Sequence, residues 1–202
     1  MNARDEVLSR IRTALTPPPA LSVTVPRDYH RGGGQIASMD LLVSRLQDYR
    51  AVVHRCEAAQ VPALLGRLVV GRVVIPEAFP PAWLAEVAAH RVEDAPTLTP
   101  QQLDGLDAVL TTCTVAVAET GTIILDGAAG QGRRALSLVP DRHVLVVRAE
   151  QVVAGVPQAL QRLDPRRPQT WISGPSATSD IELQRVEGVH GPRTLTVVLV
   201  EP

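Results

Sequence analysis

Lysine is absent from this chain, and all 20 of its basic residues are arginines. Schiff-base chemistry and the phosphate-binding lysine of a Walker loop are therefore excluded within the chain. Recognition of anions would fall to guanidinium groups, which favour planar, bidentate partners such as carboxylate and phosphate. A bias in the coding sequence explains the missing lysine equally well.

Cysteine is scarce as well, with only Cys56 and Cys113 in 202 residues. The two lie far apart and in unrelated patterns. The chain by itself therefore contains neither a disulfide framework nor the Cys-x-x-Cys spacing of a metal or iron–sulfur site. We expect two reduced, partly buried thiols, no metal and no cofactor.

Long hydrophobic runs and an excess of charge are also missing. No segment approaches the ~18 uninterrupted apolar residues of a membrane span, and the N-terminal stretch "MNARDEVLSRIRTALTPPP" lacks the apolar core of a signal peptide. A formal net charge of -1 gives no overall attraction to nucleic acid or to an anionic membrane. These observations predict a cytoplasmic protein that neither spans a membrane nor binds nucleic acid.

The residues that are present suit a globular protein, because 45% of the 202 residues are hydrophobic and can form a large core. Residues 2–15 carry apolar side chains at helical spacing, and the prolines at 17–19 end that helix. A polar, Pro/Gly-rich stretch follows. We therefore predict an N-terminal helix and arm over residues 1–34, and one α/β domain over residues 35–202.

Beyond the arm, short β-branched runs alternate with helical segments. Strands are expected at 51–56, 72–76, 107–119, 122–125, 143–147, 170–173 and 194–200, and helices at 38–50, 61–69, 81–90, 99–106 and 149–163, the last interrupted by Pro157. This alternation predicts an α/β fold with a largely parallel sheet and helices on both faces. Because the runs between Val109 and Leu125 are joined without a helix, the sheet should be mixed.

The segment "GQGRRA" at residues 130–135 fits the dinucleotide-binding fingerprint G-x-G-x-x-A and follows a predicted strand. Three features argue against that function. The residues "DGAA" separate the strand from Gly130, fewer than two helical turns fit between Arg133 and Pro140, and the motif lies late in the chain. We therefore do not interpret this stretch as a Rossmann phosphate loop.

The first polar cluster begins with "AETGT", where Glu119 precedes Thr120, Gly121 and Thr122 at the entry to an apolar strand. A carboxylate at a strand end can act as a base or a nucleophile. The simpler alternative is a structural turn in which the threonine hydroxyls donate to Glu119.

The same cluster continues with three glycines and two arginines. Gly127, Gly130 and Gly132 could orient backbone amides towards an anion. Arg133 and Arg134 could then hold a carboxylate or a phosphate in bidentate fashion. The alternative is a solvated loop whose arginines face water.

The second polar cluster is "SGPSATSDIELQRVEGVHGP", residues 173–192, which follows an apolar strand. Its hydroxyls and acid crowd a turn at which a short helix could begin and bind an anion through its free amides. His190 lies between two glycines, which would expose an imidazole suited to proton transfer. A lone histidine in a turn is more often structural.

Three segments carry a resemblance to a known family: "AETGTIIL", "GQGRRALSLVPDRHVLVV" and "SGPSATSDIELQRVEGVHGPRTLTVVLV". In this order and spacing they resemble the lactate-utilisation (LUD) domain, and the whole chain is similar to the lactate-utilisation protein C family. The resemblance in motifs runs from about Ala108 to the C-terminus. Before Gly105 it rests on length and on the layout of helices and strands.

The resemblance implies a mixed α/β fold similar to the ribose-phosphate isomerase, glucosamine-phosphate deaminase and CoA-transferase group. It implies a role in a cytoplasmic system that oxidises L-lactate to pyruvate, with iron–sulfur partner subunits. Because this sequence lacks the cluster-binding cysteines of those partners, we expect a non-redox component. We further expect it to bind a small carboxylate or phosphate ligand, with homo-oligomerisation left open. No established catalytic residues come with it, so the matching positions are candidates. The catalytic candidates are Glu119 and His190, and the ligand-binding candidates are Thr120, Gly121, Thr122, Gly130, Gly132, Arg133, Arg134, Ser173, Gly174, Ser176, Thr178 and Asp180.

Two alternatives stay open. One is an independent enzyme of the sugar-phosphate isomerase or CoA-transferase type that uses Glu119, and the other is a non-catalytic domain that senses a metabolite. A geometric expectation accompanies the site proposal. Glu119, Arg133, Ser176 and His190 should line one concavity, because open α/β sheets bind ligands where such loops converge.

Overall fold

A computed structural model describes residues 2–15, 24–28, 36–94, 98–178, 186–188 and 190–202. The chain divides into two units, Met1–His30 and Arg31–Pro202. The first contains helix α1 (Ala3–Ala14), whose N-cap Asn2 accepts a hydrogen bond from the Asp5 amide at 2.9 Å. The apolar residues of α1 lie at helical spacing as expected, but within the described residues none of them is buried.

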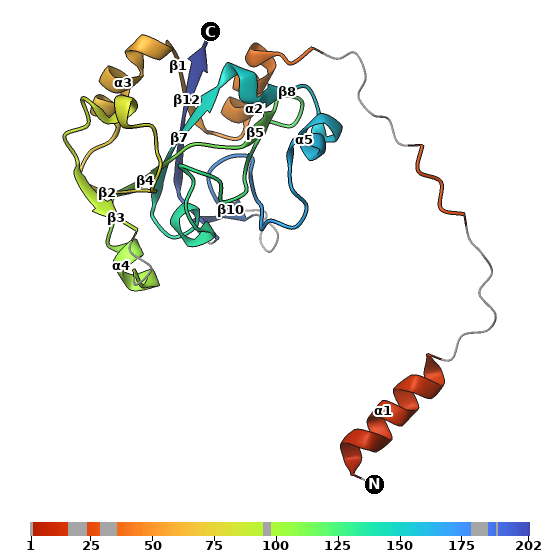
Figure 1. The fold of residues 1–202 in the computed structure, drawn as a ribbon. Coiled ribbons are helices and arrows are strands. Elements are labelled where there is room, and N and C mark those ends of the chain that lie inside the picture. Colours follow the sequence, from red (N-terminus) through yellow and green to blue (C-terminus); the bar gives the residue numbers. More distant parts are fainter. Residues whose placement is uncertain (1, 16–23, 29–35, 95–97, 179–185, 189) are drawn as a thin grey trace. The chain divides into compact units, whose positions relative to one another are not determined.

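The second unit is built on a six-stranded sheet in which all neighbouring strands run parallel. The strand order is β1-β12-β7-β4-β2-β3, and β12 and β7 run side by side through it (Figure 1). The strands are β1 (Val52–Glu57), β2 (Arg72–Ile75), β3 (His90–Glu93), β4 (Ala108–Thr111), β7 (Arg142–Arg148) and β12 (Thr194–Glu201). Their continuous apolar runs are typical of a sheet that is covered on both faces.

Helices cover both faces of this sheet, as the sequence predicts. On one face, helix α3 (Val61–Leu68) packs against alternate residues of the central strands: Val144, Val146, Val198 and Val200. On the other face, helix α2 (Met39–Asp48) packs against the residues between them: Leu145, Val147, Val197 and Leu199. Ser38 begins α2 by accepting a hydrogen bond from the Leu41 amide at 3.1 Å, which is the predicted N-cap.

A second sheet of four strands shares the face covered by α2. Its order is β8-β5-β6-β9, with bounds Val152–Val153, Val115–Val117, Thr122–Leu125 and Thr170–Ile172. β5 pairs with β8 in parallel, whereas β5–β6 and β6–β9 are antiparallel. The fold is α/β with parallel and antiparallel pairs, as expected, but the antiparallel pairs lie outside the six-stranded sheet.

The small sheet is buried on two sides because its residues alternate between two cores. Ile123 and Leu125 pack with Leu145 and Leu199 of the large sheet. Val117 and Ile124 instead pack with Ala159 of helix α5 (Val156–Arg162) and with Leu163, the residue that follows the helix. The small sheet therefore packs β6 against β7 and carries β9 at the side of β6.

Shorter elements complete the unit. Helix α4 (Pro100–Asp104) begins at Thr99, whose side chain and that of Gln102 form a reciprocal capping box. The remaining elements are the two-stranded ladder of β10 (Ala177–Thr178) and β11 (Val186–Glu187) and the 3₁₀ helices η1 (Ala58–Gln60), η2 (Pro81–Leu84), η3 (Arg134–Ser137) and η4 (Ala149–Gln151).

Two predicted helices are partly wrong. Over residues 81–90 only η2 forms, and β3 follows because His90 donates to the Gly71 carbonyl and pairs with β2. Over residues 149–163, Val152 and Val153 leave the helical pattern to add strand β8 to β5. Pro157 then lies in the first turn of α5, where a proline is tolerated, rather than interrupting a longer helix.

Candidate ligand site

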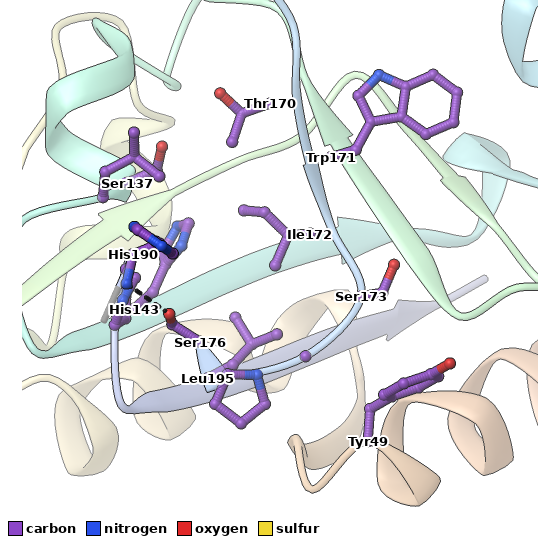
Figure 2. Close-up of a pocket in the computed structure, with 15 residues that line it drawn as sticks. Tyr49, Ser137, His143, Thr170, Trp171, Ile172, Ser173, Ser176, His190 and Leu195 are labelled. Carbon is purple, nitrogen blue, oxygen red and sulfur yellow. Dashed lines mark hydrogen bonds between the residues drawn. The ribbon is translucent and has the colours of Figure 1, made fainter. Parts of the chain in front are cut away.

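A cavity of about 420 Å³ lies beside the starts of β7 and β12. We call it the histidine pocket and define it by its lining: Tyr49, Ser137, Leu138, His143, residues 170–176, residues 190–192 and Leu195. In Figure 2, His143, His190 and Ser176 lie on one side of the cavity, and Tyr49 and Trp171 lie on the other. Open α/β sheets usually bind ligands at the carboxyl ends of their strands, so this position at the amino ends departs from the rule.

The two polar clusters are joined beside this pocket, at Ser173. Strand β6 pairs with β9, and a chain of hydroxyls joins them: Thr122 Oγ1 lies 2.8 Å from both Thr120 Oγ1 and Ser173 Oγ. Further along, the Ser176 amide donates to the Pro192 carbonyl at 2.8 Å, and the His190 amide donates to Ser176 Oγ at 3.1 Å. These bonds hold the turn at 173–176 against the turn at 190–192.

His143 is the buried histidine of the pocket, with 1% of its surface exposed. Its Nε2 lies 2.7 Å from Thr111 Oγ1, whereas its Nδ1 is buried and has no hydrogen-bond partner within the described residues. Burial lowers the pKa of His143 to about 3, because the protein interior disfavours the imidazolium. The ring is therefore neutral at neutral pH.

A second cavity, of about 470 Å³, adjoins the first and shares Ser137 and Thr170 with it. We call it the arginine pocket and define it by its lining: Leu125, Asp126, Gly127, Gln131, Gly132, Arg133, Arg134, Ser137, Arg167, Pro168 and Thr170. Two of its arginines already have carboxylate partners. Arg133 Nε donates to Asp94 at 3.1 Å, and Arg167 donates to Asp126 at 3.2 Å.

Asp126 in the wall of the arginine pocket is buried, with only 7% of its surface exposed. Its carboxylate accepts from Thr114 Oγ1, from the Ala128 amide and from Arg167. Burial on its own raises the pKa of Asp126, but these hydrogen bonds outweigh burial and hold the pKa below its ordinary value. The carboxylate is thus a fixed negative charge beside the arginines.

The glycine loop of the first cluster is bonded internally. The Gly130 amide donates to the Glu77 carbonyl, and the Gly127 amide donates to Gln131 Oε1. Since these amides already have acceptors, they do not form the open anion-binding concavity that the sequence suggests. After this loop only the four-residue helix η3 forms, which confirms that the dinucleotide fingerprint lacks its helix.

Glu119 lies apart from both pockets. It is exposed, its amide donates to the Ala154 carbonyl, and its Oε2 is close to Gly155 at the start of α5. The expectation that Glu119, Arg133, Ser176 and His190 line one concavity is therefore wrong for Glu119 and Arg133. The reason is that β5, which leads to Glu119, is held by β8 and α5, so that Glu119 lies beside the start of α5. Arg133 is held by Asp94 and by the Leu98 carbonyl.

The other candidates are distributed as follows. Ser173, Gly174, Ser176 and His190 line the histidine pocket, and Arg133, Arg134 and Gly132 line the arginine pocket. Gly121 has a packing role: at φ 62° it lies against α2, where a Cβ would come within 2.6 Å of Arg45 Cβ. Thr178 belongs to β10, and Asp180 lies outside the described residues.

Sequence reasoning missed several lining residues of the histidine pocket, among them Tyr49, Ser137, His143 and Thr170. A signal was present for one of them. His143 opens the apolar run "HVLVV", and a polar side chain at the edge of a buried strand needs a partner or a function. Nothing in the sequence placed the others near it.

Both thiols are buried, and burial raises the pKa of Cys113 to about 12, so this thiol stays protonated and unreactive. In the described part of the chain, no three His, Cys, Asp or Glu side chains gather as a metal site would need. Among the described helices, none is both long and apolar enough to cross a bilayer.

Comparison with known proteins defines the class to which this α/β fold belongs. The family model of the LUD domain matches residues 82–200, and the chain belongs to this family. A crystal structure of a DUF162 family protein from Deinococcus radiodurans shares the fold, with a TM-score of 0.69 and 39% identity over 80% of this chain and 94% of that one.

Relatives in sequence carry a more specific name. A protein of Deinococcus radiodurans named lactate utilization protein C is 49% identical over 77% of this chain and 76% of its own length. A protein of the same name from Shouchella clausii is 32% identical over 50% of this chain and 47% of its own length. The protein YkgG of Escherichia coli is 37% identical over 42% of this chain and 40% of its own. With the last two, the chain aligns over less than half of the relative.

Proposed function

We propose that this protein is a non-redox component of a system that oxidises L-lactate to pyruvate. In this role it binds a small carboxylate or another small anion, the iron–sulfur partner subunits, or both. The observation that carries the proposal is the 49% identity, over 77% of this chain, with a relative named lactate utilization protein C. The match of the LUD domain model to residues 82–200 supports the same proposal.

The absence of clustered cysteines in the sequence supports a role without electron transfer by this chain. Its two thiols occur singly, and a cluster needs several thiolate ligands. Electrons from lactate would then pass to partner subunits that carry clusters. The histidine pocket, with its serines and its two histidines, supports the binding of a small organic ligand.

The proposed function is tested by growth. Deletion of the gene from its source bacterium should abolish growth on L-lactate as the carbon source and leave growth on pyruvate normal, because the defect precedes pyruvate. A plasmid copy should restore growth. The purified chain alone should not reduce an artificial electron acceptor with L-lactate. Normal growth of the deletion strain on L-lactate would refute the proposal.

The partner part of the proposal has its own test. A tagged copy of the protein, purified from cells growing on L-lactate, should retain subunits that contain iron and acid-labile sulfide. Cells growing without lactate serve as the comparison. A stoichiometric cluster on the purified chain itself would contradict the non-redox assignment. The enzyme alternative based on Glu119 gains no support, since that carboxylate lies outside the histidine pocket.

A further inference from the structure

The buried nitrogen Nδ1 of His143 calls for a hydrogen-bond partner. Buried polar atoms in folded proteins almost always have a hydrogen-bond partner, because an unpaired one loses its bonds to water without replacement. Nδ1 of His143 is buried and lacks a partner within the described residues. Of the described cavities, only the histidine pocket touches His143. The histidine pocket is therefore the described space from which a partner would approach Nδ1.

The neighbouring Thr111 decides what kind of partner Nδ1 needs. If Nε2 donated to Thr111 Oγ1, the threonine hydrogen and the Nδ1 lone pair would both lack partners within the described residues. If Thr111 instead donates to Nε2 across the 2.7 Å separation, only one group is unpaired, the Nδ1–H. The second tautomer leaves fewer buried polar groups unsatisfied. Nδ1 is then a donor, and its missing partner is an acceptor oxygen.

The rest of the pocket restricts the ligand. Its lining, as the structure describes it, contains no Arg, Asp or Glu and combines hydroxyls with apolar surface such as Ile172 and Leu195. Ser176 Oγ accepts from the His190 amide, which leaves its own hydrogen free to donate. A phosphate ester carries about two charges and calls for arginine. Hydroxyl and imidazole donors suit a single carboxylate at the mouth together with an uncharged oxygen deeper inside.

We propose that the histidine pocket binds a small monocarboxylate with an oxygen on its second carbon, the class of 2-oxo and 2-hydroxy acids. Ser176 donates to the carboxylate, and Ser173 does the same while it accepts from Thr122 Oγ1. His143 Nδ1–H donates to the oxygen on the second carbon. The volume of about 420 Å³ admits acids longer than three carbons. This inference rests on the proposed function for its biological setting and names the ligand class of the same site.

The test pairs two ligands with two variants. Pyruvate has the second oxygen, and propionate is a matched acid without it. In His143→Asn the amide nitrogen, attached to Cγ, takes the place of Nδ1. In His143→Gln the polar atoms lie one bond further out, where Nε2 faces Thr111. Calorimetric titration of each folded protein with each acid then isolates the contact between the second oxygen and Nδ1 as a double-mutant cycle.

The expected result is a preference for pyruvate over propionate of about tenfold in the wild-type protein and in His143→Asn, in line with one net hydrogen bond. In His143→Gln the preference should fall to about onefold. An unchanged preference in His143→Gln overturns the inference. So does a wild-type protein that binds no pyruvate.

A second measurement keeps the inference testable if a variant does not fold. The ¹⁵N spectrum of the wild-type imidazoles should show Nδ1 of His143 protonated, and this signal should shift with pyruvate but not with propionate. A signal that neither acid shifts means that Nδ1 bonds only to a water molecule, which overturns the inference.

The two proposals fail in different experiments. If the deletion strain cannot grow on L-lactate but the protein binds no pyruvate, the ligand class is wrong and the function stands. If pyruvate binds as expected and the deletion strain grows normally on L-lactate, the site stands and the function is wrong.

Discussion

The histidine pocket and the arginine pocket share Ser137 and Thr170 but differ in how far their polar groups are already paired. In the arginine pocket, Arg133 and Arg167 face carboxylates of the same chain at hydrogen-bond distance. In the histidine pocket, the described lining contains no Arg, Asp or Glu. Its buried nitrogen, Nδ1 of His143, has no hydrogen-bond partner within the described residues.

This difference shows why charge alone is a weak guide to a binding site. Arg133 and Arg134 predicted an anion site from sequence, yet Arg133 is paired with Asp94, which lies 39 residues away in the chain. Arg167, which was not among the predicted residues, is paired with Asp126. A ligand would have to compete with these carboxylates, which the fold holds in place. An uncharged donor without an acceptor meets no such competition.

The largest expected effect is on the free energy of unfolding, when a glycine in the wall of each pocket is replaced by alanine. Gly174 of the histidine pocket has φ 145°, and a Cβ there would lie 2.8 Å from Tyr49 Cβ. Gly174→Ala should lower the free energy of unfolding by about 3 kcal/mol, since strain and overpacking add. In the arginine pocket, Gly127→Ala should cost about 1 kcal/mol: its φ is 73°, but the nearest atom is 3.7 Å away. Urea unfolding of both variants measures this, and equal losses would contradict it.

A smaller effect is expected on the pH dependence of the free energy of unfolding, because His143 is buried as a neutral imidazole. As pH falls below the ordinary pKa of 6.5, the unfolded chain binds a proton that the folded chain refuses until about pH 3. The free energy of unfolding should therefore fall by about 1.4 kcal/mol per pH unit in that window, and this group should add no dependence above it.

The variant His143→Asn serves as the control for this pH dependence, because asparagine does not titrate. Urea unfolding at pH 6.5, 5.5 and 4.5 should show a steeper loss for the wild-type protein than for the variant. Asp126 in the arginine pocket differs, since its pKa is lowered and its contribution is lost only below its ordinary value of 3.8. Parallel curves for the two proteins would mean that the imidazole is not buried in neutral form.

The smallest expected effect is at Arg134, which is exposed in the arginine pocket. Arg134→Gln should change the free energy of unfolding by less than about 0.5 kcal/mol, as for most surface substitutions. The affinity of the Arg134→Gln variant for pyruvate should differ from that of the wild-type protein by less than about twofold. A loss of about tenfold would reverse the comparison and return the site to the arginines that the sequence first suggested.

Much of the fold could be predicted from the sequence because local patterns dominate where an element is long and apolar. The helix after Ser38 and the strands around "HVLVV" and "TLTVVLV" formed as expected. The strand β3, "HRVE", was missed because only Val92 in it is apolar and its pairing with β2 is supplied by tertiary contact.

The site was predicted less well, for a related reason. Ser176 and His190 share a pocket, but Glu119 does not join them, since β5 carries it to the side held by β8. His143 and Thr111 lie 32 residues apart, and only the registry of β4 on β7 brings their side chains within 2.7 Å.

By itself the sequence determined the α/β class, the helix caps, the lack of clustered thiols and the motifs that mark the LUD domain, because each depends on residues close in the chain. The tertiary structure decided which arginines are already paired, which histidine is buried and which loops face one another. Those properties depend on strand order and register, which join segments far apart in sequence and fix the burial and the partner of each polar group.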